Sequence, residues 1–178
     1  TFPTPFFVKP VADGSSIGVF LVEDFRRSAE KIIHALEKYT ILLVEEQIRG
    51  REFTVGILGE RALPVVELRP KRKFYDYCAK YTRGMTEYLV PAPLPEDWRR
   101  RLQALALRVH RVLGLRDFSR VDLVTDRKGR PFVLEANTIP GFTELSLLPK
   151  AAREAGISFE NLCLRLVKMA WNRKNGKA

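Results

Sequence analysis

The amino-acid sequence predicts an α+β fold in which an antiparallel sheet is flanked by helices. In three segments, near residues 23–39, 97–113 and 158–172, apolar residues recur every three or four positions, as in amphipathic helices. Several shorter runs are apolar or alternate between apolar and polar residues, as strands do. Tight turns at residues 59–60 and 126–129 join neighbouring runs, which favours antiparallel hairpins.

The N-terminal half is predicted to contain one helix and five short strands. The strands are residues 6–8, 19–22, 41–44, 52–59 and 62–68. The helix at residues 23–39 repeats Phe25, Ile32 and Leu36 on one face, which predicts burial of that face. Residues 69–93 hold many aromatics, Gly84 and two prolines without a clear period, and we expect a long loop there.

The C-terminal half is predicted to hold two helices around a hairpin. The helix at residues 97–113 ends before Gly114, where a helix-terminating glycine is common. Its arginines 99–101 are expected to form a solvated face. The hairpin strands are residues 120–124 and 131–135, a Pro-Gly loop follows at 138–146, and Ser158 can cap the last helix.

The composition of the 178 residues excludes several classes of protein. Hydrophobic residues make up 46%, including 11 Phe, 5 Tyr and 2 Trp, which is too apolar for a disordered chain. No apolar run approaches the ~18 residues that span a bilayer. Cys78 and Cys163 cannot form a disulfide framework, which favours a reducing cytoplasm. His34 and His110 are expected to be ordinary helix residues. The net charge of +10 leaves three kinds of anionic partner open, namely nucleic acid, an anionic membrane and nucleotide phosphate.

Four polar residues of the second hairpin form the clearest candidate site. Strand side chains alternate between faces, and the turn is predicted to pair Arg120 with Glu135 and Asp122 with Val133. Arg120, Asp122, Glu135 and Asn137 would then project from one face. Two carboxylates and an amide oxygen are ligands that Mg²⁺ prefers. The alternative is a solvated polar face with an ordinary Arg120–Glu135 pair.

A loop of small residues follows Lys9 and is a candidate phosphate-binding loop. Gly14 and Gly18 permit close approach of the backbone, and the hydroxyls of Ser15 and Ser16 can hold phosphate oxygens. No Gly-Lys-Ser/Thr sequence follows, so this is not a Walker A motif. A plain flexible hairpin loop is the alternative.

Two further regions are weaker candidates. Glu45 and Glu52 could accept hydrogen bonds from an exocyclic amine and from ribose hydroxyls, or they are surface acids. Lys80 and Tyr81 lie in an aromatic loop that could close over phosphates, although packing of the aromatics explains it equally well.

Five sequence blocks, in order, resemble the D-alanine–D-alanine ligase family of the ATP-grasp superfamily. The blocks are KP with GSSIG at 9–18, VE with GREFTV at 44–55, FYDYCAKY at 74–81, RVD at 120–122, and EANTIPG at 135–141. The match runs from about Phe6 to the last helix. It implies an ATP-grasp fold, with residues 1–46 as the remainder of the central subdomain and residues 47–178 as the C-terminal subdomain.

The resemblance also implies a role for each matching residue. ATP is expected to lie between the subdomains, with its phosphates near Lys9, Gly14, Ser16 and Lys80, its adenine near Glu45, Glu46, Ile48, Phe74 and Leu134, and its ribose near Glu52. Asp122, Glu135 and Asn137 are expected to bind two Mg²⁺ ions, with Mn²⁺ as an alternative. Arg120 and the N–H of Gly141 are expected to stabilise an oxyanion, Ser15 and Tyr81 to hold the loops closed, and Ser146 and Leu147 to contact the second D-alanine.

The implied activity is ATP-dependent joining of two D-alanine molecules through a D-alanyl phosphate, for peptidoglycan precursors. The full-length enzyme is expected to be a cytoplasmic homodimer without nucleic-acid or membrane partners. A D-alanine–D-lactate ligase or another ATP-grasp carboxylate–amine ligase is the alternative, and Tyr81 favours an amine acceptor. A basic nucleic-acid-binding module is the alternative of a different class, suggested only by the charge.

The chain departs from the family pattern in two respects. Cys78 stands where the family usually has glutamate. The family's N-terminal domain and the first part of its central domain have no counterpart in the sequence, which opens on threonine. We therefore expect a C-terminal portion that does not make the dipeptide by itself.

Overall fold

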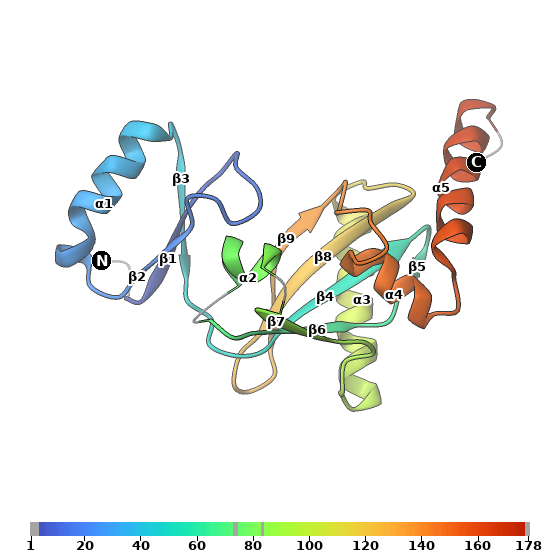
Figure 1. Ribbon diagram of the computed structural model, residues 1–178, viewed down its shortest axis with the longest axis horizontal. Helices are drawn as coiled ribbons and strands as arrows, with labels where there is room; N and C mark the ends of the chain where they lie inside the picture. The colour runs from blue at the N-terminus through green and yellow to red at the C-terminus, as the bar shows by residue number, and fades with distance from the viewer. Residues whose placement is uncertain (1–3, 73–74, 83, 177–178) are drawn as a thin grey trace. The chain divides into compact units, whose positions relative to one another are not determined.

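The chain divides into two units, seen in a computed structural model that describes residues 4–72, 75–82 and 84–176 (Figure 1). The first unit comprises Thr1–Ile48 and Pro70–Glu87, and the second comprises Arg49–Arg69 and Tyr88–Ala178. The subdomains predicted at 1–46 and 47–178 remain a proposal, and by its contacts the segment 70–87 groups with the N-terminal residues.

The first unit is a small antiparallel sheet with one long helix. Its strands are β1 (Phe6–Pro10), β2 (Phe20–Val22) and β3 (Leu42–Glu46), in the order β2-β1-β3, and its helices are α1 (Phe25–Lys38) and α2 (Tyr77–Tyr81). Alternate side chains of β1 and β2 point inward and pack with Ala35 of α1. The strands predicted near residues 6–8, 19–22 and 41–44 are confirmed.

Helix α1 is confirmed, but most of its predicted apolar face is not buried. Asp24 caps the helix by accepting a hydrogen bond from the N–H of Arg27 at 3.1 Å. Only Ala35 is fully buried among the helix residues. Three large apolar side chains of the helix are more than half exposed: Phe25, Ile33 and Leu36.

Part of the long loop predicted at residues 69–93 is instead regular structure. This prediction was wrong for α2 and for β7 (Thr86–Leu89). Both elements are short and held by local polar contacts. The Asp76 carboxylate caps α2 through the N–H of Ala79 at 2.8 Å, and the Thr86 hydroxyl donates to the Ala79 carbonyl at 2.7 Å. Such contacts leave no periodic signal in the sequence.

The second unit contains most of a six-stranded sheet and three helices. The strands are β4 (Glu52–Leu58), β5 (Arg61–Ala62), β6 (Val66–Pro70), β7, β8 (Phe118–Thr125) and β9 (Pro131–Asn137). Their order is β7-β6-β4-β8-β9, with β5 paired to β4. The helices are α3 (Glu96–Val112), α4 (Leu147–Glu154) and α5 (Phe159–Lys174). The pairings of β4 with β6 and β8, and of β8 with β9, are antiparallel, so the predicted α+β class is confirmed.

The side chains of β4 alternate between the two faces of this sheet, and each face packs against a different helix. Phe53, Val55 and Ile57 belong to the core cluster that includes Leu102 and Ala106 of α3. The intervening residues face the other way. A Cβ placed on Gly56 would lie 2.6 Å from Leu148 Cδ1, so α4 approaches closely on that second face.

Helix α4 was not predicted from the sequence. Its residues Leu147, Leu148, Pro149, Ala151 and Ala152 are buried and its polar residues lie on the opposite face, but eight residues are too few for a helical period to stand out in the sequence. The proline occupies the first turn, where the missing N–H removes no helical hydrogen bond.

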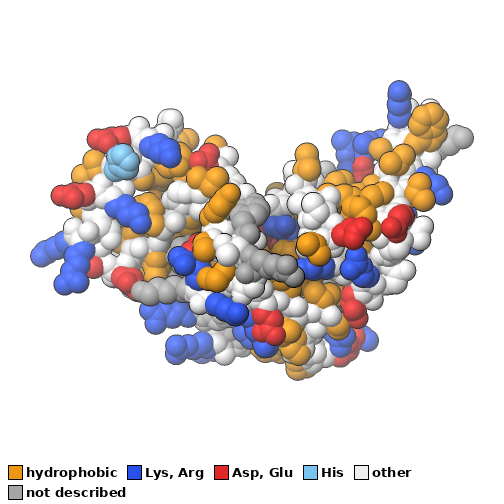
Figure 2. All heavy atoms as spheres, in the orientation of Figure 1, with side chains coloured by type: hydrophobic (Ala, Val, Ile, Leu, Met, Phe, Trp, Pro, Cys, Tyr) orange, Lys and Arg blue, Asp and Glu red, His pale blue; other side chains and the backbone are white. Residues whose placement is uncertain are grey.

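Surface charge and apolar side chains are mixed over the face seen in Figure 2. On α5, Leu164, Val167 and Trp171 are each more than half exposed. Within the described ranges, no helix has both the length and the apolar composition needed to cross a bilayer.

Candidate functional site

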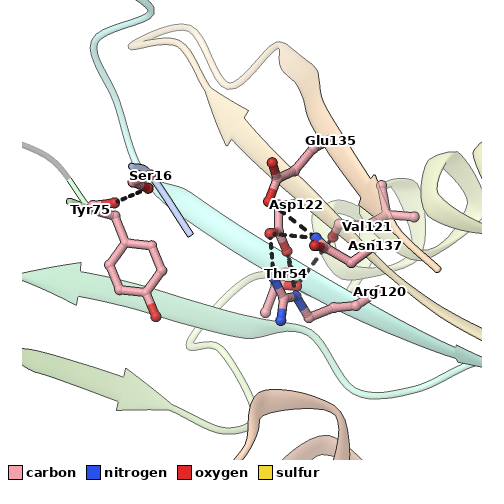
Figure 3. Close-up of polar contacts among 8 residues, drawn as sticks. All are labelled: Ser16, Thr54, Tyr75, Arg120, Val121, Asp122, Glu135 and Asn137. Atoms are coloured by element: carbon pink, nitrogen blue, oxygen red, sulfur yellow. Dashed lines mark hydrogen bonds and ion pairs between the residues drawn. The ribbon is translucent and has the colours of Figure 1, made fainter. Parts of the chain in front are cut away.

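The hairpin of β8 and β9 carries the predicted polar cluster, but in a different register. Asp122 lies opposite Glu135 and Arg120 lies opposite Asn137, so the predicted Arg120–Glu135 and Asp122–Val133 pairings are wrong. Two shifts of one residue each are the reason: Thr125 already pairs with Pro131 at the turn, one position from the predicted register, and an extra β9 residue at the bulge between Asp122 and Leu123 adds the second. The four polar side chains still gather on one face of the hairpin (Figure 3).

Asp122 is the centre of this cluster. Arg120 donates two hydrogen bonds to the Asp122 carboxylate, from Nε to Oδ1 at 2.9 Å and from Nη2 to Oδ2 at 2.7 Å. The Thr54 hydroxyl donates to Oδ1 at 2.5 Å, from the neighbouring strand β4. Asn137 Nδ2 donates to Asp122 Oδ2 and to Glu135 Oε1, both at 3.2 Å. These contacts join all four predicted residues and add Thr54.

The contacts keep Asp122 ionised. Burial acts to raise the pKa of this carboxyl group, but the hydrogen bonds and charge of Arg120, with the bond from Thr54, outweigh burial and hold the pKa below its ordinary value. The Asp122 side chain is 18% exposed, whereas Glu135 is exposed. One carboxylate is thus fixed within the sheet while its neighbour faces solvent.

The donor set of the cluster fits Mg²⁺ bound partly by a substrate. Among the described residues, no group of three or more His, Cys, Asp or Glu side chains could hold a metal ion. The hairpin supplies two carboxylates and one amide oxygen, a set that Mg²⁺ completes with phosphate oxygens and water. Asn137 would bind through Oδ1 while its Nδ2 keeps the two hydrogen bonds.

The loop after β9 brings three further predicted residues together. A Cβ on Gly141 would stand 3.3 Å from Ser146 Oγ, so the two residues adjoin. Ser146 immediately precedes α4, and its Oγ accepts a hydrogen bond from the N–H of Thr143 at 3.0 Å. Leu147 is buried as the first residue of α4. The predicted oxyanion donor and D-alanine contacts therefore share one loop–helix junction.

In the first unit, Lys9 and Glu45 bind each other. Lys9 Nζ lies 2.5 Å from Glu45 Oε2, and both side chains are more than half buried. The sequence assigned them to opposite ends of ATP, the phosphates and the adenine. Because an ammonium group has three N–H donors, this ion pair leaves Lys9 able to bind a phosphate oxygen as well. Their roles toward ATP remain predictions.

The small-residue loop is tied to the segment before α2. Ser15 and Ser16 have positive φ angles of 56° and 59°, and the Ser16 hydroxyl donates to the Tyr75 carbonyl at 3.2 Å. Lys80 Nζ lies 5.3 Å from the centre of the Tyr75 ring. The structure thus brings Ser16 and Lys80, two predicted phosphate contacts, to the same residue.

The remaining predicted residues are individually placed. Phe74 and the side chain of Tyr81 lie outside the described part of the chain. The described part of the chain includes Gly14, Glu46, Ile48, Glu52 and Leu134. Of these, Leu134 lies at the bulge of β9, and its side chain is 38% exposed. Cys78, in place of the family's glutamate, contacts Thr82 Oγ1 at 3.4 Å.

Thr54 and Tyr75 were missed by the sequence analysis. Thr54 is a polar residue between the apolar neighbours Phe53 and Val55, which was an available signal. Tyr75 acts through its backbone carbonyl, which has no sequence signature.

Comparison with known proteins identifies the family. Residues 1–168 match the family model described as the D-ala D-ala ligase C-terminus. The chain belongs to this family. The family predicted from the five sequence blocks is thereby confirmed.

Relatives within the family are similar over nearly the whole chain. A D-alanine–D-alanine ligase of Methylacidiphilum infernorum is 44% identical over 97% of this chain and 57% of its own length. One from Aquifex aeolicus is 47% identical over 89% of this chain and 54% of its own length. The chain therefore spans about half the length of the curated relatives it matches.

Solved structures of the family share the fold. A D-alanine–D-alanine ligase from Bacillus anthracis matches with a TM-score of 0.84 and 32% identity, over 98% of this chain and 57% of that one. The VanG D-Ala:D-Ser ligase from Enterococcus faecalis matches with a TM-score of 0.82 and 34% identity, over 93% of this chain and 49% of that one. The predicted ATP-grasp fold is confirmed.

Proposed function

We propose that this chain is the nucleotide- and metal-binding part of a D-alanine–D-alanine ligase. The observation that carries the proposal is the cluster of Arg120, Asp122, Glu135 and Asn137 on one face of the β8–β9 hairpin. The family assignment supports the same activity, since the curated relatives are named D-alanine–D-alanine ligases. The alternative of a nucleic-acid-binding module rests on the net charge of +10 alone.

The proposed reaction has two steps. The carboxylate of the first D-alanine attacks the γ-phosphate of ATP, giving D-alanyl phosphate and ADP. The amine of the second D-alanine then attacks the acyl carbonyl carbon, and inorganic phosphate leaves with its bonding electrons. Both steps concentrate negative charge, so positioning and charge neutralisation supply most of the catalysis.

The residues of the hairpin have distinct roles in this proposal. Glu135, Asp122 and Asn137 would hold Mg²⁺, which neutralises charge on the transferred phosphoryl group. Arg120 would stabilise the oxyanion of the second step, and its two-point bond to Asp122 fixes the plane of the guanidinium in advance. Thr54 would hold the Asp122 carboxylate in place from β4.

Nucleotide binding in the first unit is proposed for Lys9 and the loop at residues 14–18. A related D-alanine–D-alanine ligase from Bacillus anthracis was crystallised with ATP and has a TM-score of 0.82 and 28% identity to this chain. Ser16 and Lys80 would bind phosphate oxygens from the segments that meet at Tyr75. The proposed contacts of the adenine and ribose remain Glu45, Glu46, Ile48, Glu52, Phe74 and Leu134.

The second substrate is proposed to be D-alanine, contacted by Ser146 and Leu147. The similarity to a D-Ala:D-Ser ligase makes D-serine an alternative acceptor, and D-lactate is the other. Incubating the full-length protein with each acceptor and measuring phosphate release distinguishes them. We further propose that the full-length enzyme is a cytoplasmic homodimer. Sedimentation of the purified protein tests whether it is a dimer.

Thermal unfolding of this chain with Mg·ATP tests the nucleotide site. Saturation at a hundredfold above Kd would stabilise the protein by about 2.7 kcal/mol and raise Tm accordingly. We expect Glu135→Gln to abolish the increase and Glu144→Gln, an exposed acid on the following loop, to retain it. An equal increase in all three proteins would contradict the metal assignment.

In the full-length protein, Glu135→Gln should lower dipeptide synthesis by about a hundredfold or more. The isolated chain should form no dipeptide. Unimpaired synthesis by the Glu135→Gln enzyme would overturn the proposed role of Glu135, and absence of dipeptide formation in the unaltered full-length enzyme would overturn the proposed activity.

A further inference from the structure

A shallow depression of about 540 Å³ lies where α3 meets the β8–β9 turn. Its walls combine basic and apolar side chains, namely Arg101, Arg108, Arg130, Leu105, Pro131 and Phe132. This volume is in the range of pockets that hold small organic ligands. All of these residues belong to the second unit.

The three arginines reach the depression from two directions. Arg101 and Arg108 are seven residues apart on α3, which places them on the same face about 10 Å apart along the axis. Leu105 lies between them on that face. Arg130 comes from the turn, where its Nε donates to Asp126 Oδ2 at 2.7 Å, and its guanidinium carbon lies 5.9 Å from the centre of the Phe132 ring.

Two of the three arginines of the depression lack an ion-pair partner among the described residues, whereas Arg130 is paired with Asp126 at 2.7 Å. Arg99 and Arg100 both form ion pairs with Glu96, at 2.5 and 2.7 Å. Arg101 and Arg108, in contrast, make no ion pair with any residue of the ranges that the structure describes. None of the described residues that line the depression is acidic. Two unpaired arginines, with the paired Arg130 beside them, favour an anionic occupant of this small volume.

The chemistry of the walls narrows the class of anion. A phosphate monoester carries about −1.5 to −2 charge at neutral pH and three acceptor oxygens, more than one carboxylate provides. Guanidinium groups bind phosphate oxygens through paired N–H bonds. Leu105, Pro131 and Phe132 offer apolar surface beside them, which suits the organic part of an ester better than inorganic phosphate.

We propose that this depression binds a small phosphate monoester with an apolar or aromatic body. The site is separate from the Asp122 cluster, because α3 packs on the face of the sheet formed by Val121 and Leu123, whereas Asp122 faces the other side. The proposal therefore stands whether or not the chain acts as part of a D-alanine ligase.

Calorimetric titration of the chain with phenyl phosphate, in the presence of EDTA, tests the proposal. EDTA removes metal from the carboxylate cluster, so binding there does not contribute. We expect saturable binding of phenyl phosphate, weaker binding of inorganic phosphate, and shifts of the backbone amide resonances of Leu105 and Phe132 on titration. Loss of two charge-assisted contacts in the Arg101→Ser, Arg108→Ser double variant should weaken binding about tenfold or more.

A charge-matched variant separates this site from general electrostatic attraction. Arg61 and Arg165 are exposed and lie outside the depression, so the Arg61→Ser, Arg165→Ser variant should bind phenyl phosphate within about twofold of the parent, a difference of about 0.4 kcal/mol. Equal weakening of both double variants would overturn the proposal. Arg108→Gln alone provides a milder second variant, and an unchanged affinity in it and in the double variant would also overturn the site.

A lipid headgroup is the other source of the same phosphate chemistry. The chain should not sediment with vesicles of phosphatidylglycerol more than the charge-matched variant does. Sedimentation that depends on Arg101 and Arg108, without any binding of phenyl phosphate, would overturn the small-ligand proposal in favour of a membrane surface.

Discussion

Arg51 and Glu67 form a two-point ion pair in the second unit. Arg51 Nε lies 2.8 Å from Glu67 Oε1, and Nη2 lies 2.7 Å from Oε2. Arg69 adds a third contact to Oε2 at 3.2 Å. The Glu67 side chain is only 3% exposed, whereas the two arginines are 40% and 48% exposed. A buried carboxylate is thus held by two cations that remain in contact with water.

Replacing Glu67 by Gln should destabilise the second unit by about 1–3 kcal/mol. A buried carboxylate loses two charged partners, but the arginines can be rehydrated, which keeps the cost below that of a fully buried pair. Urea unfolding at neutral pH measures the change. Glu60→Gln, which removes the exposed ion pair with Arg111, should cost less than about 0.5 kcal/mol. Equal costs for the two variants would contradict the assigned role of burial.

The contribution of Glu67 should also depend on pH. Burial acts to raise the pKa of its carboxyl group, but the bonds and charges of Arg51 and Arg69 prevail and lower it. The folded pKa therefore lies below the unfolded one, and the stabilisation is present above about pH 4.5 and lost as pH falls through the folded pKa. The difference in unfolding free energy between parent and Glu67→Gln should shrink in that acid range, and a constant difference would contradict this account.

His110 should give a second pH dependence, closer to neutrality. The ring is 2% exposed, and its Nδ1 lies 2.8 Å from Ser119 Oγ. Burial lowers the pKa of His110, and the opposing charges of Glu60 and Asp117 do not restore it. Below about pH 6.5 the unfolded chain binds more protons than the folded one, so stability falls as pH falls toward the folded pKa.

The variant His110→Gln should therefore show a flatter stability profile between about pH 5 and 7. The expected slope lost is at most about 1.4 kcal/mol per pH unit. His34→Gln is the matched control, since the His34 side chain is 81% exposed and its Nδ1 lies 3.5 Å from the exposed Glu37 carboxylate. A profile for His110→Gln as steep as that of the parent would exclude His110 as the titrating group.

The sequence predicted the face of the β8–β9 hairpin correctly but not its register. Alternation alone places Arg120 and Asp122 on one side, and that parity survives any shift of pairing by two residues. The bulge after Asp122 depends on how β9 fits against β8 in the folded sheet, which no local pattern encodes. Arg120 therefore lies opposite Asn137 instead of Glu135, and its guanidinium binds Asp122 on the same strand.

Helices were predictable where a stripe of apolar residues faces one partner. Leu102 and Ala106 of α3 meet the sheet in this way, and that helix was predicted within about a turn. Helix α4 has only eight residues, which are too few for its helical period to stand out in the sequence. For α1, periodicity predicted the helix but not the exposure of Ile33 and Leu36. The spacing of apolar residues indicates an apolar helix face, but it does not indicate whether another part of the chain packs against that face.

Gly129 should tolerate no side chain, because Trp98 occupies the space. A Cβ there would lie 2.2 Å from Trp98 Cη2, and the residue has a φ of +77°. Gly129→Ala should cost about 2–4 kcal/mol, from overpacking added to backbone strain. Gly114 has a similar φ of +63° with open space around it, so Gly114→Ala should cost only about 1–2 kcal/mol. Chemical unfolding followed by tryptophan fluorescence compares them, and equal costs would rule out the contact with Trp98.

We expect residue 137 to determine how strongly the stability of the hairpin depends on a divalent cation. Its Nδ2 donates to Asp122 and Glu135 at 3.2 Å, so Asn137→Asp replaces two favourable bonds by repulsion among three carboxylates. Without divalent cation, the variant should lose about 1–3 kcal/mol of stability. If these side chains form a Mg²⁺ site, the added charge strengthens it, and saturating Mg²⁺ should raise the Tm of the variant more than that of the parent. Asn172→Asp, an exposed change of the same charge on α5, should respond as the parent does, so equal responses to Mg²⁺ in all three proteins would refute the metal site.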